Sequence, residues 1–300
     1  MDMTHNKCCR HGASLRRRRR RRRKILRSII FSCSIIAVAV FVAVGSRMIR
    51  SGDGRTNKYD VEAGNNTYDN AVIENSKISE KNKIQNNQLM LDDIMNSTQY
   101  PKQLQELALK NEEALEFVYD YPTEHVKEHT IDLTEEASMD SVPLFVQWDK
   151  RWGYEKYSGN FFAASGCGPT TLSMVVVYLT HNREASPIAV AKYSKEAGYS
   201  VDGSGSSWTL ISEGCMHYGV KAKTVALDES RMKAELDAGH PIVINVGPGD
   251  FTDTGHFMVI TGYDDEGFSI NDPNSIEKSG KRWLFKNISS QIRAVWSMYV

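Results

Sequence analysis

The segment that most constrains the fold of this chain is Gly166-Cys167-Gly168-Pro169-Thr170-Thr171, because it joins a cysteine to the start of an apolar helix. Proline is favoured in the first turn of a helix, where its missing N–H costs nothing. Beyond the proline, apolar residues recur at the spacing of one helix face: Leu172, Val175, Val176 and Leu179. The pattern predicts a buried helix whose N-terminus lies at or just after Cys167.

A cysteine in this position is a candidate nucleophile. The free N–H groups and the macrodipole at a helix N-terminus stabilise an anion, and the thiolate is the reactive form of cysteine. The flanking Gly166 and Gly168 let the backbone turn sharply and leave the sulfur open. The alternative is a small buried apolar cysteine, which is the commoner fate of a lone cysteine. We interpret Cys215 in that second way, as part of the core.

Charge is distributed unevenly along the chain, although the formal net charge is zero. Residues 1–50 contain 14 Lys and Arg against one acid, which leaves 23 basic and 36 acidic residues in the remainder. An unbroken basic run, Arg16 to Arg23, precedes an uncharged apolar span from Ser28 to Ser46. A basic head on an acidic body is not typical of a nucleic-acid-binding domain, so no nucleic-acid partner is predicted.

The apolar span is a candidate membrane anchor. Its 19 residues come close to the ~20 that cross the hydrocarbon core. Because the basic flank comes first, residues 1–27 are expected to stay cytoplasmic and the rest of the chain to lie outside. A cleaved signal peptide is the alternative, but the span is long for one and its cleavage pattern is poor. We expect an uncleaved, single-pass signal anchor over 28–46, which inserts into the lipid bilayer of the cell membrane.

Three regions follow the expected anchor. Residues 47–99 are polar, and a stretch of this composition cannot bury enough apolar surface to fold alone. We expect them to form a disordered stalk. Residues 100–140 are expected to form a lead-in helix, from Pro101 to about Val118, and a linker. Residues 141–300 then form one folded body, which is long enough to bury a single core.

Within the body, helix patterns precede strand patterns. Helices are expected at 208–218 and at 228–236, the second with Asp228 as its N-cap. Four strands are expected after them, with a hairpin turn at 264–267; they cover 241–246, 256–263, 268–271 and 283–285. Helices followed by an antiparallel sheet in one domain predict the α+β fold class.

A catalytic cysteine needs a base within reach and a group that orients the base. His256 follows Gly255 and opens an apolar strand, so it is well placed to face a cleft. A satisfied core histidine is the alternative. Asp272 ends the next strand, where Pro273 favours an extended conformation. An ordinary turn cluster is the alternative at that position.

The hairpin decides whether these two side chains can meet. Direct pairing across 264–267 places Asp272 opposite Val259, on the other face of the sheet from His256. A three-residue loop instead places Asp272 opposite Ile260, on the same face but about 13 Å along the strand from His256. Twist, a bulge or a bend must then close the gap. The hairpin therefore permits the contact without establishing it.

Gln147 is the fourth candidate site residue. It lies near the end of an extended apolar run over 143–149. Its side-chain N–H could complete an oxyanion hole together with the backbone N–H of the nucleophile, and such a donor is worth roughly 10²–10³ in rate.

Four segments together resemble a bacterial cysteine-peptidase family, the family 39-like group, which is papain-like in fold and related to the bacteriocin-processing peptidases. The segments are Val142-Pro143-Leu144-Phe145-Val146-Gln147-Trp148-Asp149-Lys150-Arg151-Trp152-Gly153, Ser165-Gly166-Cys167-Gly168-Pro169-Thr170, Gly249-Asp250-Phe251-Thr252-Asp253-Thr254-Gly255-His256-Phe257 and Asn271-Asp272-Pro273-Asn274.

The resemblance implies a papain-like α+β domain over 141–300 that acts as a cysteine-type peptidase. It implies Cys167 as nucleophile, His256 as base, Asp272 as the orienting acid and Gln147 in the oxyanion hole. It further implies a peptide or protein substrate and no need for a cofactor or metal. The sequence carries no prediction of oligomeric state.

One departure from the bacteriocin-processing relatives concerns the substrate. Those relatives are fused to an export ATPase and act in the cytoplasm, whereas this chain has no P-loop sequence and its body is expected outside. The difference argues against a double-glycine leader as the substrate. A cell-wall peptide hydrolase with the same thiol mechanism and a catalytically silent peptide-binding module are the two alternatives.

Overall fold

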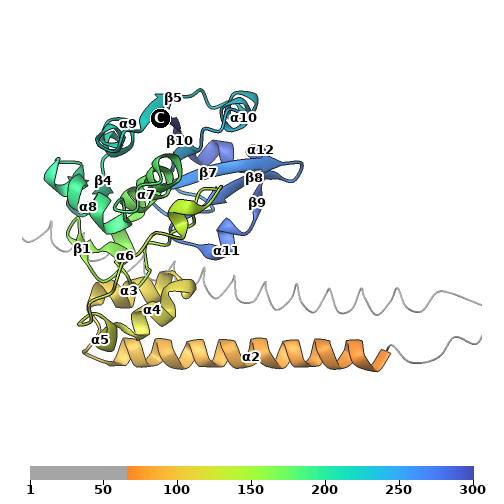
Figure 1. Cartoon of the computed structure of the whole chain (residues 1–300). Helices are drawn as coiled ribbons and strands as arrows, with labels where there is room; N and C mark the ends of the chain where they lie inside the picture. Colours follow the sequence, from red (N-terminus) through yellow and green to blue (C-terminus); the bar gives the residue numbers. More distant parts are fainter. Residues whose placement is uncertain (1–65) are drawn as a thin grey trace, which may run out of the picture. The chain divides into compact units, whose positions relative to one another are not determined.

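A computed structural model describes residues 66–300 of the chain, with side chains from residue 79 onward (Figure 1). The cytoplasmic tail predicted at 1–27, the anchor predicted at 28–46 and the first part of the predicted stalk lie outside the described residues. Among the helices that are described, none combines the length and the apolar character needed to cross a membrane.

The predicted disordered stalk contains a helix, which corrects that prediction for residues 66–96. Helix α2 covers Asn66–Asn96. Its last turns carry Met90, Leu91 and Ile94, which pack against the lead-in segment, and Ile94 is fully buried. Most of the stability of a helix in a protein comes from packing of its apolar face. The polar overall composition of residues 47–99 therefore did not reveal this helix, whose packed apolar residues lie near its end.

The lead-in segment is helical but interrupted, whereas a single helix over 101–118 was predicted. Asn111 adopts an extended conformation, and its side chain accepts the Glu113 N–H at 3.0 Å. Asparagine offers the backbone this alternative to a continuous helix. The predicted apolar face is nevertheless buried. The segment consists of α3 (Lys102–Lys110), η1 (Glu112–Ala114), α4 (Leu115–Tyr119), α5 (Tyr121–Glu124) and η2 (Glu136–Ser138).

The helical half of the body is built around α7 (Cys167–Thr180), which begins where the sequence predicted it. The helix predicted at 208–218 is divided at Glu213 into α9 (Thr209–Ser212) and η3 (Gly214–Tyr218). The one predicted at 228–236 is α10 (Glu229–Asp237), capped by Asp228 as expected. The other elements of this half are β1 (Lys156–Tyr157), β2 (Asn160–Phe161), α6 (Phe162–Ser165), α8 (Pro187–Glu196), β3 (Ser200–Val201) and β4 (Gly205–Ser206).

The C-terminal half contains a six-stranded antiparallel sheet, so the predicted combination of helices with a C-terminal antiparallel sheet is confirmed. Its strand order is β5-β10-β6-β7-β8-β9. The strands are β5 (Lys221–Thr224), β6 (Ile242–Val246), β7 (His256–Asp264), β8 (Gly267–Asn271), β9 (Arg282–Trp283) and β10 (Ile292–Tyr299). The connecting helices are α11 (Ile276–Ser279), α12 (Phe285–Ile288) and η4 (Ser289–Gln291).

Two strands of this sheet were not predicted, and one predicted strand is shorter. The inner strand β10, next to the edge strand β5, is interrupted by a register shift between Ile292 and Ala294, and Arg293 breaks its apolar pattern. β5 is a polar edge strand, and Phe285, expected in a strand, begins α12. The polar strand β5 forms because β10 pairs with it, which leaves a weak signal in its local sequence, whereas β10 does contain strand-favouring residues.

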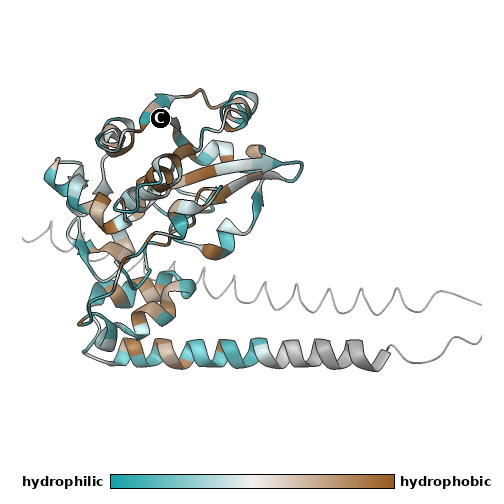
Figure 2. Ribbon diagram, in the orientation of Figure 1, coloured by the Kyte–Doolittle hydropathy of each residue, from teal (hydrophilic) through white to brown (hydrophobic). Residues whose placement is uncertain are grey.

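The sheet is covered on both faces, and its side chains alternate between two apolar clusters. Val243, Phe257 and Val259 belong to the cluster that contains α7, whereas Ile244 and Met258 belong to the cluster that contains Met232 of α10. Apolar residues accordingly concentrate along α7 and β7 (Figure 2). This packing holds the start of α7 and the start of β7 in fixed positions.

Candidate active site

Cys167 is the first residue of α7 and is half-buried. Its backbone N–H belongs to the first helical turn, whose N–H groups have no acceptor within the helix. Gly168 is required for packing, since a Cβ atom there would lie 2.6 Å from Ser206 Oγ. The flanking glycine therefore serves close approach to β4, whereas the sequence had suggested a sharp turn.

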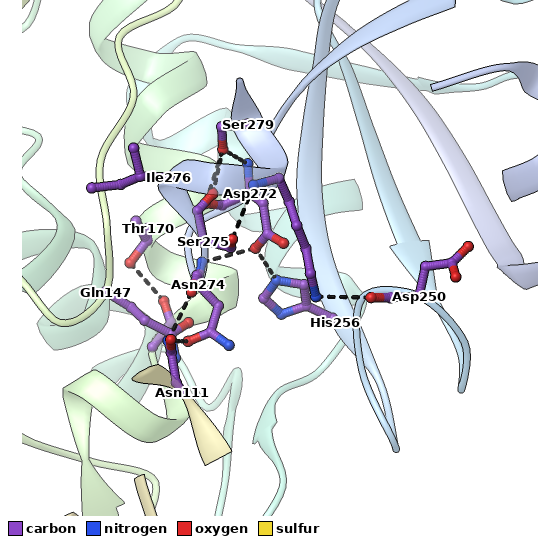
Figure 3. A network of polar contacts seen from close by, with 12 residues as sticks. Asn111, Gln147, Thr170, Asp250, His256, Asp272, Asn274, Ser275, Ile276 and Ser279 are labelled. Carbon is purple, nitrogen blue, oxygen red and sulfur yellow. Dashed lines mark hydrogen bonds and ion pairs between the residues drawn. The ribbon is translucent and has the colours of Figure 1, made fainter. Parts of the chain in front are cut away.

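His256 is the first residue of β7, and its ring is hydrogen-bonded to Asp272. The distance from His256 Nε2 to Asp272 Oδ1 is 2.7 Å. Both residues are buried, with His256 6% exposed and Asp272 1% exposed. Figure 3 shows the Asp272 carboxylate directed at the imidazole. The structure thus brings together the two residues whose contact the sequence left open.

A β-bulge in β7 makes this contact possible. The hairpin begins with Asp264 opposite Gly267, but Thr261 is left without a partner and Val259 then lies opposite Asn271. Continuing this register places Asp272 opposite Met258, on the face shared by alternate residues from His256 onward. Of the two pairings considered, the direct one is found at the turn, where Tyr263 lies opposite Phe268; the turn has two residues, and the extra residue lies inside the strand.

The electrostatic environment favours a thiolate–imidazolium pair. Burial by itself lowers the pKa of His256, but the charge and hydrogen bond of Asp272, together with Cys167, raise it to about 10. Burial by itself raises the pKa of the Cys167 thiol, but the hydrogen bond and charge of His256 outweigh it and lower the pKa. The Phe257 and Gly168 N–H groups stabilise the sulfur anion further.

Gln147 lies in a turn at the wall of the same cleft and is buried. Its Nε2 donates to the Ala163 carbonyl at 2.7 Å. This acceptor sets the orientation of the amide, since the reverse orientation would bring two oxygens together. An amide nitrogen carries two hydrogens, so one N–H of Gln147 is left for a ligand.

Three of the four candidate site residues line a cleft of about 590 Å³, and Asp272 lies behind His256, outside the lining. Cys167, Gln147 and His256 lie along it, and the loop 249–255 forms part of its wall. The lead-in helix α3 forms another part, which the sequence did not predict, because no local pattern links α3 to a cysteine far along the chain. Among the side chains that the structure describes, residues 79–300, there is no group of three or more His, Cys, Asp or Glu that could hold a metal ion. Cys215 is buried and free, as expected for a core residue.

Residues 139–300 match the sequence model described as the Peptidase_C39 like family. Among solved structures, the peptidase domain of Streptococcus ComA, a bi-functional ABC transporter involved in a quorum-sensing pathway, is 18% identical. That comparison covers 45% of this chain and 90% of that one, with a TM-score of 0.37. A protein designated a C39-like peptidase from Bacillus anthracis is 16% identical, covering 57% and 98%, with a TM-score of 0.33. A search of curated proteins found no significant match.

Proposed function

Because this chain belongs to the peptidase C39-like family, we propose that it is a cysteine peptidase with Cys167, His256 and Asp272 as its catalytic triad. Membership of the family supports a function of the cysteine-peptidase type. The observation that carries the assignment of residues is the 2.7 Å bond from His256 to Asp272 beside the half-buried Cys167. We further assign Gln147 to the oxyanion hole, with peptides or proteins as substrates.

The proposed reaction has two halves. The Cys167 thiolate attacks the carbonyl carbon of the peptide bond, and the carbonyl electrons move to oxygen, where the N–H groups of Gln147 and Cys167 stabilise them. The His256 imidazolium gives its proton to the amine as the C–N bond breaks, which leaves a thioester. Neutral His256 then takes a proton from water while the water oxygen attacks the thioester. The carboxyl product leaves and the thiolate forms again.

The proposal includes a location outside the cytoplasm. Its support is the uncharged span Ser28–Ser46 behind a basic run, the pattern of a signal anchor with a cytoplasmic N-terminus. In this arrangement the bilayer holds residues 28–46, and the catalytic domain over 141–300 meets extracytoplasmic peptides.

Hydrolysis of a peptide library by the full-length protein tests the proposal. Cys167→Ala should reduce hydrolysis by at least ~10³-fold, because it removes the nucleophile. The matched control is Cys215→Ala, which removes a buried thiol outside the cleft and should retain activity. Full hydrolysis by Cys167→Ala would sink the assignment. Binding without hydrolysis by the wild-type protein would favour the silent peptide-binding module, and turnover of cell-wall peptides in preference to the library would favour the cell-wall hydrolase.

A further inference from the structure

The turn that carries Asp272 is held by a segment that lies outside the family match. Asn111, which separates α3 from η1, donates its side-chain N–H groups to the Asn274 carbonyl at 2.9 Å and to Asn274 Oδ1 at 3.1 Å. The Asn274 backbone N–H in turn donates to Asp272 Oδ1 at 2.8 Å (Figure 3). Asn111 is thus connected, through Asn274, to the carboxylate oxygen of Asp272 that binds His256.

Glu113 makes a second connection, to the start of α11. Its carboxylate accepts the Ser275 hydroxyl, the Ile276 N–H at 2.7 Å and the Glu277 N–H at 3.1 Å. The first N–H groups of a helix have no acceptor within it, and a carboxylate that accepts them forms charge-assisted bonds. Glu113 therefore fixes the start of α11 from a position 162 residues earlier in the chain.

Helix α11, whose start is bonded to Glu113, is in turn hydrogen-bonded to Asp272. The Asp272 N–H donates to Ser279 Oγ at 2.9 Å, and Ser279 is the last residue of α11. The carboxylate and the backbone N–H of Asp272 are thus both bonded to groups that the lead-in segment restrains. The Pro273 carbonyl also accepts a hydrogen bond from the backbone N–H of Gln147 at 2.7 Å. The same turn therefore contacts the residues assigned to the triad and to the oxyanion hole.

We infer that Asn111 and Glu113 are positioning residues for the reaction, so that the segment before the family domain completes the active site. The inference rests on the proposed function, because it concerns how Asp272 orients the base. Neither side chain is proposed to touch the reacting atoms. Their role is to hold the 272–275 turn at the distance at which Asp272 stabilises the His256 imidazolium. A displacement of about 1 Å at a catalytic group can reduce rates about 10²-fold.

Attachment of the lead-in segment does not depend on these polar contacts. Leu104, Leu107 and Val118 pack in one apolar cluster with Phe161 and Ala163 of the body. Removing the Asn111 or Glu113 side chain leaves that cluster in place. A fold with a loosened 272–275 turn is therefore expected, rather than an unfolded protein.

The test measures the reactivity of Cys167 in the full-length protein, which requires no knowledge of the substrate. The rate at which iodoacetamide labels the Cys167 peptide is followed by mass spectrometry from pH 5 to 10. Glu113→Ala and Asn111→Ala are compared with Glu116→Ala, which removes an exposed carboxylate from α4. Asp272→Asn serves as the reference for full loss of the orienting charge.

In the wild-type protein, the thiolate forms at low pH because a stabilised imidazolium lies beside it. Glu113→Ala and Asn111→Ala should shift the onset of labelling to higher pH, in the same direction as Asp272→Asn. A shift of one pH unit lowers the labelling rate about tenfold at a pH below the onset. Glu113→Gln should give a smaller shift, because its one oxygen can still accept the backbone N–H groups. Glu116→Ala should superimpose on wild type.

Labelling profiles of Glu113→Ala and Asn111→Ala that superimpose on wild type would overturn the inference, even if the thermal midpoint falls, because that combination indicates a purely structural role. If Glu113→Ala fails to fold, Glu113→Gln and Asn111→Ala decide the question in the same assay. A wild-type profile with no labelling below the range of an ordinary thiol would count instead against the proposed function, so the two failures are distinguishable.

Discussion

At the residue scale, one carboxylate oxygen of Asp272 accepts both of the hydrogen bonds that this carboxylate makes. Asp272 Oδ1 accepts both the His256 ring at 2.7 Å and the Asn274 N–H at 2.8 Å, whereas Oδ2 is buried without a hydrogen-bond partner among the described residues. A buried polar oxygen left in this way costs about 1–3 kcal/mol. The arrangement gives up some stability and holds the imidazole in one orientation, with Nε2 bonded and Nδ1 free for Cys167.

The two cysteines of the described residues should differ sharply in their response to pH. The pKa of Cys167 is lowered, chiefly by His256 acting against burial, whereas burial raises the pKa of Cys215 to about 11. Iodoacetamide should therefore label Cys167 near neutral pH and leave Cys215 unlabelled in the native protein. Since the ion pair also needs protonated His256, hydrolysis should decline as the pH rises through about 10. Equal labelling of both cysteines near neutral pH would contradict this.

At the element scale, one glutamate joins α10 to two strands of the sheet. Glu235 accepts hydrogen bonds from Lys223 of β5 at 2.9 Å and from Ser297 of β10 at 2.7 Å. His240, just after the helix, lies 3.1 Å away. These three partners lower the pKa of Glu235 to about 2, against the opposing effect of burial. The polar edge strand β5 is thus secured by charge where it has little apolar surface.

Glu235→Gln should reduce the free energy of unfolding at pH 7 by about 1–3 kcal/mol, because charged hydrogen bonds are lost. The folded-state pKa lies below the ordinary value, so the stabilisation is complete above about pH 4.5 and is lost as the pH falls toward 2. Denaturant unfolding at a series of pH values measures the difference. The control Glu229→Gln, at the exposed start of the same helix, should change stability little. A difference that persists unchanged to pH 3 would rule out this explanation.

At the scale of the whole molecule, residues 70–300 form one compact unit that includes the lead-in segment. The apolar cluster formed by the lead-in segment also contains Phe161 and Ala163, which lie just before the segment with the candidate nucleophile. Unfolding of the lead-in segment would expose these apolar side chains and release the 272–275 turn. We therefore expect the lead-in segment and the catalytic domain to unfold together.

Leu104→Ala tests this cooperativity. Leu104 is fully buried, and its truncation should reduce the free energy of unfolding by about 2–5 kcal/mol. The transitions followed by far-UV circular dichroism and by tryptophan fluorescence should still coincide. The control is Leu109→Ala in the same helix, which truncates a side chain that is 58% exposed and should have a small effect. Two separate transitions in Leu104→Ala would indicate that the lead-in segment folds independently.

The sequence by itself was sufficient for features that local pattern controls. The start of α7 at Cys167, the cap of α10 at Asp228 and the strand that opens at His256 each follow from neighbouring residues, because capping groups and apolar periodicity act over one or two turns. The order of helices and strands then predicted the α+β class. The family resemblance implied the roles of the four candidate site residues, and the structure places all four residues around one site.

Only the tertiary structure decided how those residues meet. The bulge at Thr261 sets the register that brings Asp272 toward His256. The helix break at Asn111 also depends on the tertiary structure, because the Asn111 side chain is hydrogen-bonded to a turn 163 residues away. Contacts between distant segments leave no periodicity in either segment. The hold of Glu113 on the start of α11 could therefore be found only once the chain was folded.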